Sequence, residues 1–403
     1  MAGFGLPSAV QIDWLCSFAD MPPLYEDWSQ LADRTGSEIF LTPIWFDLWW
    51  KMLAGRRDLA CLVAYKDGVL VGLLPFAVET IWAGPVPIRL ARLAGIDPSC
   101  MIFRLPLMPE MAAGLLQTAL DHLVNTAGCH AVSFTPASEL SDLLVSVRTA
   151  CTAVPHLALT DMAEGEHVIF DLPTSFDVFL AAISKNRRAQ YRRDRRALTE
   201  TYTMQSQIYC PTADEFQAFV SFHNKQWHAV GKGGNFSDWP DNAVFYPILA
   251  KKTASKPIIQ FHKQFGTQGP LAEQFCLISG KTCHWRLPAR TLDPEAEKLS
   301  LGKVSLLIMI EELISQGVTR IEAGRGEYDY KRAFGGKSIA VHRLIVSPAT
   351  HAGRLYLRIL LVWSDLLHLF YYRIWFLKLA PRWRRLTGMA ARPLWRSWIR
   401  TRL

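Results

Sequence analysis

The chain has 403 residues, of which half are hydrophobic and a fifth are charged. This composition is ordinary for a folded globular protein and excludes a disordered or collagen-like chain. The length suits two domains with an appendage, and the net charge of +8 indicates anionic partners.

The first half of the chain predicts an α/β domain. Residues 1–36 are expected to form an N-terminal arm, and residues 37–155 a first domain without a catalytic role. A helix is predicted from Phe40 to Met52, followed by a hairpin whose strands meet at Asp67-Gly68, a strong turn signal. Further segments are predicted as helix, strand and helix at 111–126, 131–135 and 140–150.

The second half repeats this order of elements loosely, which suggests a duplicated fold. His156 to Glu166 has no periodicity and is the expected boundary, so residues 166–348 form the predicted second domain. Its strands are predicted at 167–172, 258–266, 271–279, 319–322 and 340–346, and its helices at 175–202, 212–231 and 304–315.

Eight cysteines are scattered, with no Cys-x-x-Cys pair and no histidines at ligand spacing. Neither a metal site nor a disulfide framework is therefore predicted. The first residues lack the basic start and apolar run of a secretory signal, so a cytoplasmic location is expected.

A possible anion site precedes the apolar helix at Val304–Ser315. The backbone amides of Gly302, Lys303 and Val304 lie where a helix begins, and such amides together with the positive end of the helix dipole attract phosphate groups. The alternative interpretation is a simple turn.

The loop from Ile321 to Lys331 combines glycines, carboxylates, phenols and a lysine after a strand. Acid and base groups of this kind suit proton transfer. A solvated turn with charged flanks is the alternative.

A third motif is basic. Lys185, Arg188 and Arg192 share one face of a predicted helix, which indicates an anionic ligand. The alternative is an exposed helix neutralised by Asp194 and by ions from solvent.

These three segments together resemble the acetyltransferases grouped with cellulose-biosynthesis protein D, within the GCN5-related N-acetyltransferase (GNAT) superfamily. Ser184-Lys185 with the following arginines fits the family's basic helix, and Gly326, Tyr330 and Lys331 fit its final motif. Where the family has Pro-Gly at the helix start, this chain has Leu301-Gly302. The resemblance implies tandem GNAT folds of the α/β class, with mixed, mostly antiparallel sheets flanked by helices and a helical tail.

The resemblance also implies a reaction and a set of residues. The expected donor is acetyl-CoA or another acyl-CoA, without a metal, and the acceptor is a small-molecule or glycan amine, in cell-envelope or exopolysaccharide biosynthesis. Candidate catalytic residues are Asp329, Glu327, Tyr330 and, as a rival base on a strand, Glu273. His284 is placed similarly, although a half-buried structural role is the plainer interpretation for both strand residues. Candidate donor-binding residues are Gly302, Lys303, Val304 and Arg192, and candidate substrate-binding residues are Tyr328 and Lys331.

Two other functions remain open. The segment Tyr330–Gly336 also resembles the ending of Fem-type aminoacyl transferases, whose donor would be aminoacyl-tRNA; nucleic acid is otherwise not expected. The third possibility is a non-catalytic accessory protein of polysaccharide assembly.

Residues 354–403 predict a basic amphipathic tail. Charged and polar residues interrupt its apolar run from Leu355 to Ala380, which disfavours a membrane-spanning helix and favours one that lies on an anionic surface. The protein would then be peripheral at the inner membrane. The alternative is a helix packed on its own domain.

Overall fold

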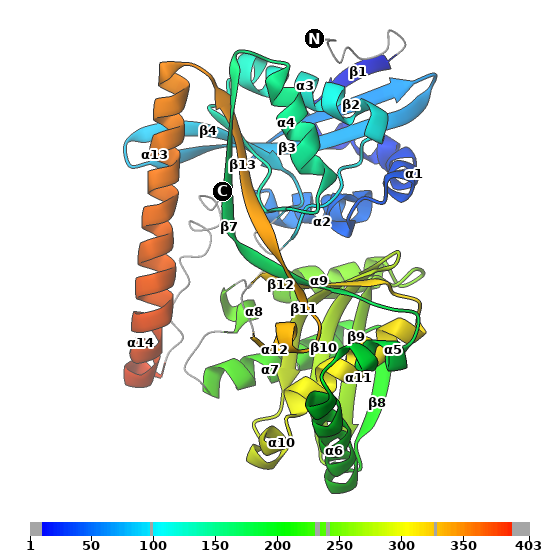
Figure 1. The fold of residues 1–403 in the computed structure, drawn as a ribbon. Coiled ribbons are helices and arrows are strands. Elements are labelled where there is room, and N and C mark those ends of the chain that lie inside the picture. Colours follow the sequence, from blue (N-terminus) through cyan, green and yellow to red (C-terminus); the bar gives the residue numbers. More distant parts are fainter. Residues whose placement is uncertain (1–9, 97–99, 230–233, 239–241, 326–328, 389–403) are drawn as a thin grey trace. The chain divides into compact units, whose positions relative to one another are not determined.

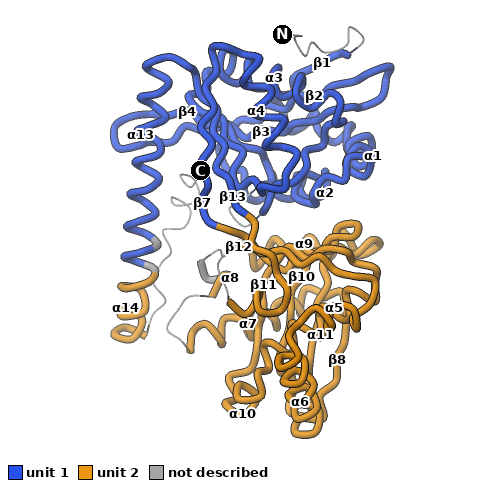
Figure 2. The backbone as a smooth tube through the Cα atoms, viewed as in Figure 1, with its two compact units in different colours: residues 1–165, 340–375, 394–403 blue, residues 166–339, 376–393 orange. Residues whose placement is uncertain are grey.

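The computed structural model describes residues 10–96, 100–229, 234–238, 242–325 and 329–388. The chain forms two compact units (Figure 2). Unit 1 comprises residues 1–165, 340–375 and 394–403, and unit 2 comprises residues 166–339 and 376–393. Each unit has its own hydrophobic core.

Unit 1 is a mixed sheet with helices on both faces (Figure 1). Its strands are β1 (Val10–Leu15), β2 (Asp58–Lys66), β3 (Val69–Ala83), β4 (Val86–Leu93), β5 (Ala131–Ser133), β6 (Ala137–Ser138) and the unit 1 parts of β7 (Leu157–Asp171) and β13 (Lys337–Pro348). Its α-helices are α1 (Tyr25–Thr35), α2 (Pro43–Leu53), α3 (Ala112–Asp121), α4 (Asp142–Thr152) and α13 (His351–His368). Its shorter 3₁₀ and π segments are η1 (Phe18–Asp20), η2 (Pro22–Leu24), η3 (Ile39–Leu41), η4 (Pro109–Met111) and η5 (His122–Thr126); η6 (Leu369–Leu379) begins in this unit.

Strand order in unit 1 is β1-β2-β3-β4-β5-β13; β4 and β5 pair in parallel, and the other neighbours in this order pair antiparallel. Neighbouring residues of a strand point to opposite faces. On β4, Ala91 and Leu93 pack with α3 and α4, whereas Ile88 and Leu90 pack with Leu357 of α13. Helix α13 therefore covers the face opposite to α3 and α4.

The predicted hairpin is confirmed. Lys66 and Val69 end the two strands, and Asp67 and Gly68 between them both have positive φ values, 51° and 75°. Two positive φ values define the turn that matches the twist of paired strands, and glycine and aspartate tolerate them best.

Three features of this organisation differ from the sequence expectations. The predicted arm at 1–36 contributes β1, which pairs with β2, and α1, which buries Trp28 and Leu31. The units divide between Gly165 and Glu166, where the second domain was expected to begin, but residues 157–166 are part of the continuous strand β7, in which Gly165 has a φ of 78°. Unit 2 stops at residue 339 rather than 348, because β13 pairs with β5 and β6 of unit 1.

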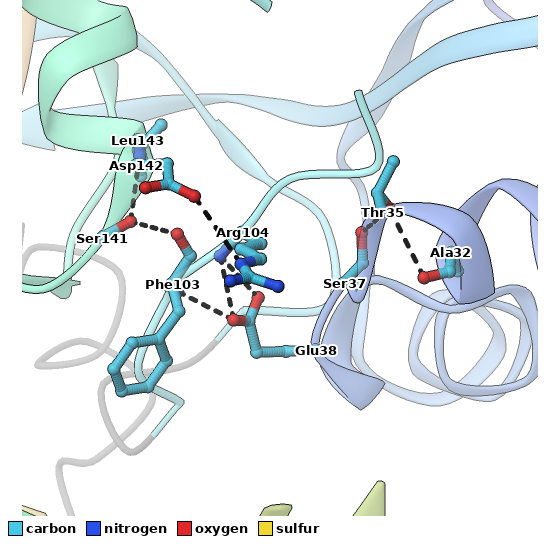
Figure 3. A network of polar contacts seen from close by, with 9 residues as sticks. All are labelled: Ala32, Thr35, Ser37, Glu38, Phe103, Arg104, Ser141, Asp142 and Leu143. Atoms are coloured by element: carbon cyan, nitrogen blue, oxygen red, sulfur yellow. Dashed lines mark hydrogen bonds and ion pairs between the residues drawn. The ribbon is translucent and has the colours of Figure 1, made fainter. Parts of the chain in front are cut away.

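A buried carboxylate holds the loop before α3 in unit 1 (Figure 3). Glu38 accepts hydrogen bonds from the backbone amides of Phe103, at 3.0 Å, and Arg104, at 2.9 Å. Burial raises the pKa of Glu38 to about 8, although these amides and the Arg104 guanidinium lower it. The carboxyl is thus poised to titrate near neutral pH.

Unit 2 has the strand order β7-β12-β11-β10-β9-β8. Its own strands are β8 (Gln205–Tyr209), β9 (Ile259–Gly266), β10 (Gly269–Ser279), β11 (Thr282–Arg290) and β12 (Arg320–Arg325). Its helices are α5 (Phe176–Ala182), α6 (Lys185–Tyr202), α7 (Ala213–Ala229), α8 (Asn235–Asp238), α9 (Asn242–Lys252), α10 (Pro294–Lys298), α11 (Leu301–Ser315), α12 (Asp329–Ala333) and α14 (Ala380–Thr387).

The two faces of this sheet carry different cores. Cys276 and Trp285 pack toward α11, whose residues are buried nearly all round. Phe261 and Phe275 pack instead against Phe216 of α7, in a tilted and an edge-on arrangement respectively. One long helix was predicted at 175–202, but Ile183 is extended and divides it into α5 and α6. The Arg188 guanidinium donates to the Ala181 carbonyl at 3.0 Å, which stabilises the end of α5.

Candidate functional site

Strands β11 and β12 run in parallel but pair over a short distance only. Thr282–His284 of β11 pair with Arg320–Glu322 of β12. Both strands then continue without pairing to each other, β11 to Arg290 and β12 to Arg325. We call the region between Trp285–Arg290 and Ala323–Arg325 the strand opening. Its apex is the His284–Glu322 pair.

Lys331 of α12 projects into the strand opening. Its Nζ atom donates a hydrogen bond of 2.5 Å to the Ala323 carbonyl of β12 and lies 5.3 Å from the ring centroid of Trp285 on β11. The side chain is buried, and burial lowers the pKa of Lys331 to about 8, although Glu322 raises it. A buried amine with such a pKa exchanges a proton near neutral pH.

The two glycines after α12 explain how Lys331 is held. Gly335 has a φ of 93°, which side chains disfavour. A Cβ atom on Gly336 would lie 2.6 Å from Val168 Cγ1 and 2.9 Å from the Lys331 carbonyl. The backbone amide of Gly336 donates to that carbonyl at 3.0 Å. The Gly-Gly sequence therefore ends α12 tightly against β7 and positions the lysine.

A buried acid–base pair lies at the apex. Nδ1 of His167, on β7, is 2.7 Å from Oε2 of Glu322, and the Gly324 amide donates to Oε1 of Glu322 at 3.1 Å. His284, the register partner of Glu322, is also buried, and burial together with Arg286 lowers the pKa of His284 to about 3. His284 is thus neutral at physiological pH.

Glu273 lies elsewhere on the sheet. Glu273 pairs with Ala289 of β11. Ala289 is five residues from His284 on that strand, so at the usual rise of a strand the two lie about 16 Å apart. Tyr209 donates its hydroxyl to Glu273 Oε1. Burial raises the pKa of Glu273, and Lys263 opposes this rise. The two carboxylates, Glu273 and Glu322, are therefore not brought together.

The structure separates the other loop candidates. Asp329 is almost fully exposed and forms an ion pair of 3.0 Å with Arg332, one turn ahead on α12. Tyr330 is partly buried against the unit 2 core. Glu327 and Tyr328 lie outside the described residues.

The predicted anion site lies at the start of α11. Ser300 adopts a left-handed conformation there, with a φ of 51°. Its carbonyl already accepts from the amides of Lys303, at 2.8 Å, and Val304, at 3.1 Å. A ligand at this helix start would have to share these two donors. A Cβ atom on Gly302 would lie 3.6 Å from Arg290 Cδ and 4.0 Å from Arg290 Nη1, so a side chain at this position would touch the Arg290 side chain without a clash.

Arg290, the neighbour of Gly302, also lines a pocket of about 390 Å³. Arg290 and Lys225 line it with positive charge, whereas Asp293 adds a negative charge and accepts from the Tyr202 hydroxyl at 2.5 Å. Glu297 lies 3.2 Å from Arg290. The pocket is thus of mixed charge, with its basic groups on the side of β11 and α7.

Arg192 belongs to a different pocket. It lines a cavity of about 470 Å³ with Lys185, Arg188 and Asp177, all from α5 and α6. No residue of α11 lines this pocket in the described part of the chain. The structure therefore does not bring Arg192 together with Gly302, Lys303 and Val304 at one site.

Sequence reasoning missed His167 and Glu322 as a pair. They are 155 residues apart, and both had been treated only as strand residues. The one available signal was a charged residue between Ile321 and Ala323, in a strand whose neighbours are buried. Among the described residues, no group of three His, Cys, Asp or Glu side chains is arranged to hold a metal ion.

Residues 185–332 match the family described as "Acetyltransferase (GNAT) domain". This segment is therefore similar to GNAT acetyltransferase domains. It contains α6, the strand opening and Lys331, so the match lies wholly within unit 2. The predicted α/β class, with mostly antiparallel sheets flanked by helices and a helical C-terminal segment, is confirmed.

Solved structures also resemble the chain. The crystal structure of FemX has a TM-score of 0.55 at 8% identity, over 82% of this chain and 96% of FemX, and so shares the fold. L-PGS from Bacillus licheniformis has a TM-score of 0.49 at 12% identity, over 84% and 95% of the two chains. A tandem GNAT protein from the clavulanic acid biosynthesis pathway has a TM-score of 0.43 at 13% identity, over 84% and 99%. No curated protein matches the chain.

Proposed function

We propose that unit 2 transfers an acyl group from an acyl thioester, such as acetyl-CoA or a longer acyl-CoA, to an amine. The observation that carries this proposal is the strand opening inside a GNAT domain. Parallel strands that part after three paired residues no longer pair with each other, so an extended ligand could bind between their facing edges once Lys331 releases the Ala323 carbonyl. The amide-containing arm of CoA is such a ligand.

The ends of the donor fit two features of unit 2. The phosphates would lie near Gly302, where the start of α11 and the Arg290 side chain supply positive charge, and Lys225 adds positive charge to the pocket that Arg290 also lines. The thioester would lie in the strand opening and supply an acyl carbon that is activated for attack. Arg192 remains a proposed donor contact on its separate pocket.

Lys331 is placed to stabilise negative charge in this reaction. Attack by the amine breaks the C–S bond, and charge develops first on the acyl oxygen and then on the departing sulfur. A fixed donor in a water-poor site stabilises such charge strongly. We assign this role to the Lys331 ammonium, which would exchange the Ala323 carbonyl for the acyl oxygen.

The attacking amine must also lose a proton. We propose the His167–Glu322 pair at the apex as one acceptor, since a buried imidazole and a buried carboxylate lie there 2.7 Å apart. Asp329 and Tyr330 at the start of α12 remain proposed as base and acid, and Glu273 as a rival base. The acceptor amine, on a small molecule or on a glycan of the cell envelope or of an exopolysaccharide, rests on the sequence resemblance.

The test uses the purified full chain with acetyl-CoA, a long-chain acyl-CoA and free CoA. Binding should raise the melting temperature, because a ligand selective for the native state stabilises it by mass action. Acyl transfer to simple amines and amino sugars is followed by mass spectrometry. Lys331→Met should abolish transfer, and Lys337→Met is the matched control because Lys337 is exposed and pairs with Asp171. If no acyl-CoA binds or reacts, the proposal is wrong.

One observation favours a second donor. The fold matches FemX over most of both chains, and the sequence resembles the Fem-type ending, so aminoacyl-tRNA is the alternative donor. Stabilisation by aminoacyl-tRNA, with transfer of its amino acid and no response to acyl-CoA, would select this function. A chain that responds to neither donor would fit the accessory role in polysaccharide assembly.

A further inference from the structure

Helix α13 has two apolar faces. Leu357, Leu360 and Ser364 are buried against unit 1. Five large apolar side chains are 39–58% exposed along the same helix and at the start of η6: Leu355, Val362, Leu366, Leu369 and Phe370. At the helical rotation of about 100° per residue, these five fall within a stripe about 100° wide, centred opposite the buried face. We call them the outer stripe.

The outer stripe is unusual within the part of the chain that the structure describes. Sixteen large hydrophobic side chains are exposed there, and nine of them lie between Leu355 and Leu386. Single exposed apolar residues are normal on a protein surface, but a contiguous apolar row indicates a binding surface. The packing of Leu357 and Leu360 on the sheet fixes which way the row faces.

The charges around the stripe indicate what it binds. Residues 351–387 contain seven arginines and lysines and one acidic residue, Asp365. The Asp365 carboxylate lies 3.8 Å from Arg343 of β13, which also pairs with Glu164 at 2.6 Å, so the charge of Asp365 is compensated only in part, and the seven basic residues outnumber it. Arg354 and Arg358 are exposed along one edge of the stripe, and Arg373 continues the basic series into η6. An apolar row flanked by uncompensated positive charge is complementary to an anionic lipid surface.

The helix is suited to lie on such a surface rather than to cross it. In the described chain, no helix reaches the length and apolar character that a membrane span requires. One face of α13 is also occupied by unit 1. A helix that packs one face on its own domain and exposes an apolar face on the other side has a single orientation at a membrane surface. Its domain, here unit 1, then lies on the aqueous side.

We propose that the outer stripe of α13 docks unit 1 onto an anionic bilayer. Leu366 and Phe370 enter the interfacial layer, while Arg354 and Arg358 contact lipid phosphates. The proposal does not depend on the reaction of unit 2, since every residue involved belongs to unit 1.

The experiment is co-sedimentation of the full chain with vesicles of phosphatidylcholine and phosphatidylglycerol at 3:1, and with phosphatidylcholine alone. Binding is expected to the anionic vesicles, to weaken with added salt, and to fall at least tenfold in Leu366→Ser/Phe370→Ser. Arg354→Gln/Arg358→Gln should weaken it roughly tenfold or more. Leu140→Ser/Val145→Ser, which removes two exposed apolar residues near α4, is the matched control and should bind as the wild type does.

Three results would overturn the proposal. The first is the absence of binding to anionic vesicles. The second is an equal loss of vesicle binding in the outer-stripe and control variants. The third is binding whose strength does not change with lipid charge or with added salt. Light scattering measures the oligomeric state and so tests whether a second copy of the chain, rather than lipid, binds the outer stripe. If Leu366→Ser/Phe370→Ser converts an oligomer to a monomer and leaves vesicle binding intact, the stripe is a self-association surface instead.

Discussion

Replacing Lys331 by methionine should make unit 2 more stable while it removes activity. The fall in the lysine pKa from its ordinary 10.5 to about 8 arises from burial, with Glu322 opposing it. Each pKa unit corresponds to about 1.4 kcal/mol, so below pH 8 the buried ammonium lowers the free energy of unfolding by about 3 kcal/mol. Methionine loses the hydrogen bond to Ala323 and the contact with Trp285, worth about 1 kcal/mol each. About 1 kcal/mol of stabilisation remains.

The assay is thermal unfolding of wild type, Lys331→Met and the control Lys337→Met between pH 7 and pH 10. At pH 7 the Lys331 variant should melt roughly 2–4 °C higher for a unit of this size. Between pH 8 and pH 10.5 the unfolded chain binds more protons at Lys331 than the folded chain does. The stability of the wild type therefore rises with pH over this range, and the difference in melting temperature between Lys331→Met and the wild type becomes smaller. The reasoning would be refuted if Lys331→Met melted below the wild type at pH 7 and the difference between their melting temperatures did not change with pH.

The other predictions concern the donor, the loop and unit 1. Gly302→Val should fold normally and weaken acyl-CoA binding, measured by calorimetry; unchanged affinity would remove the site from the proposal. Asp329→Asn and Tyr330→Phe should each lower kcat by a larger factor than they lower the affinity for the acyl donor, because both side chains are proposed to act in the transition state. Full activity in both variants would favour Glu322 or Glu273 as the base. Because the pKa of Glu38 is raised to about 8, folded unit 1 binds the proton more tightly, and stability should fall by up to about 1.4 kcal/mol per pH unit between pH 5 and pH 8. Denaturant titrations should show this slope in wild type and not in Glu38→Gln.

Local chemistry made part of this structure predictable from sequence. The Asp67-Gly68 turn and the apolar helix, predicted at 304–315 and observed at 301–315, depend on nearby residues only, and both were found. The Gly-Gly after α12 was found as a motif, but its role in seating Lys331 depends on Val168 of β7. Pairings between distant segments were not predictable in this way. The His167–Glu322 pair depends on the register between β7 and β12, which no local pattern encodes.

The same limit applies to the segment between the units. His156 to Glu166 has no periodicity and was expected to separate the domains; the units do divide at Gly165, but within the continuous strand β7, in which Gly165 has a positive φ. The end of β13 was assigned to the second domain because it follows that domain in sequence. Its partners are Ser133 and Ala137, about 200 residues earlier in the chain, and only tertiary structure reveals them.

The placement of β13 has a consequence for folding during synthesis. Strand β5 of unit 1 pairs with Ile345 and Val346, which leave the ribosome only after all of residues 166–339. Synthesis at roughly 5–20 residues per second separates Ser133 from Ile345 by about 10–40 s. Throughout that interval, one edge of β5 has no partner and apolar side chains around Val132 lack Leu344 and Val346. The nascent N-terminal segment should therefore depend on chaperones until β13 emerges, whereas residues 166–339 of unit 2 can begin to fold before the rest of unit 1 is complete.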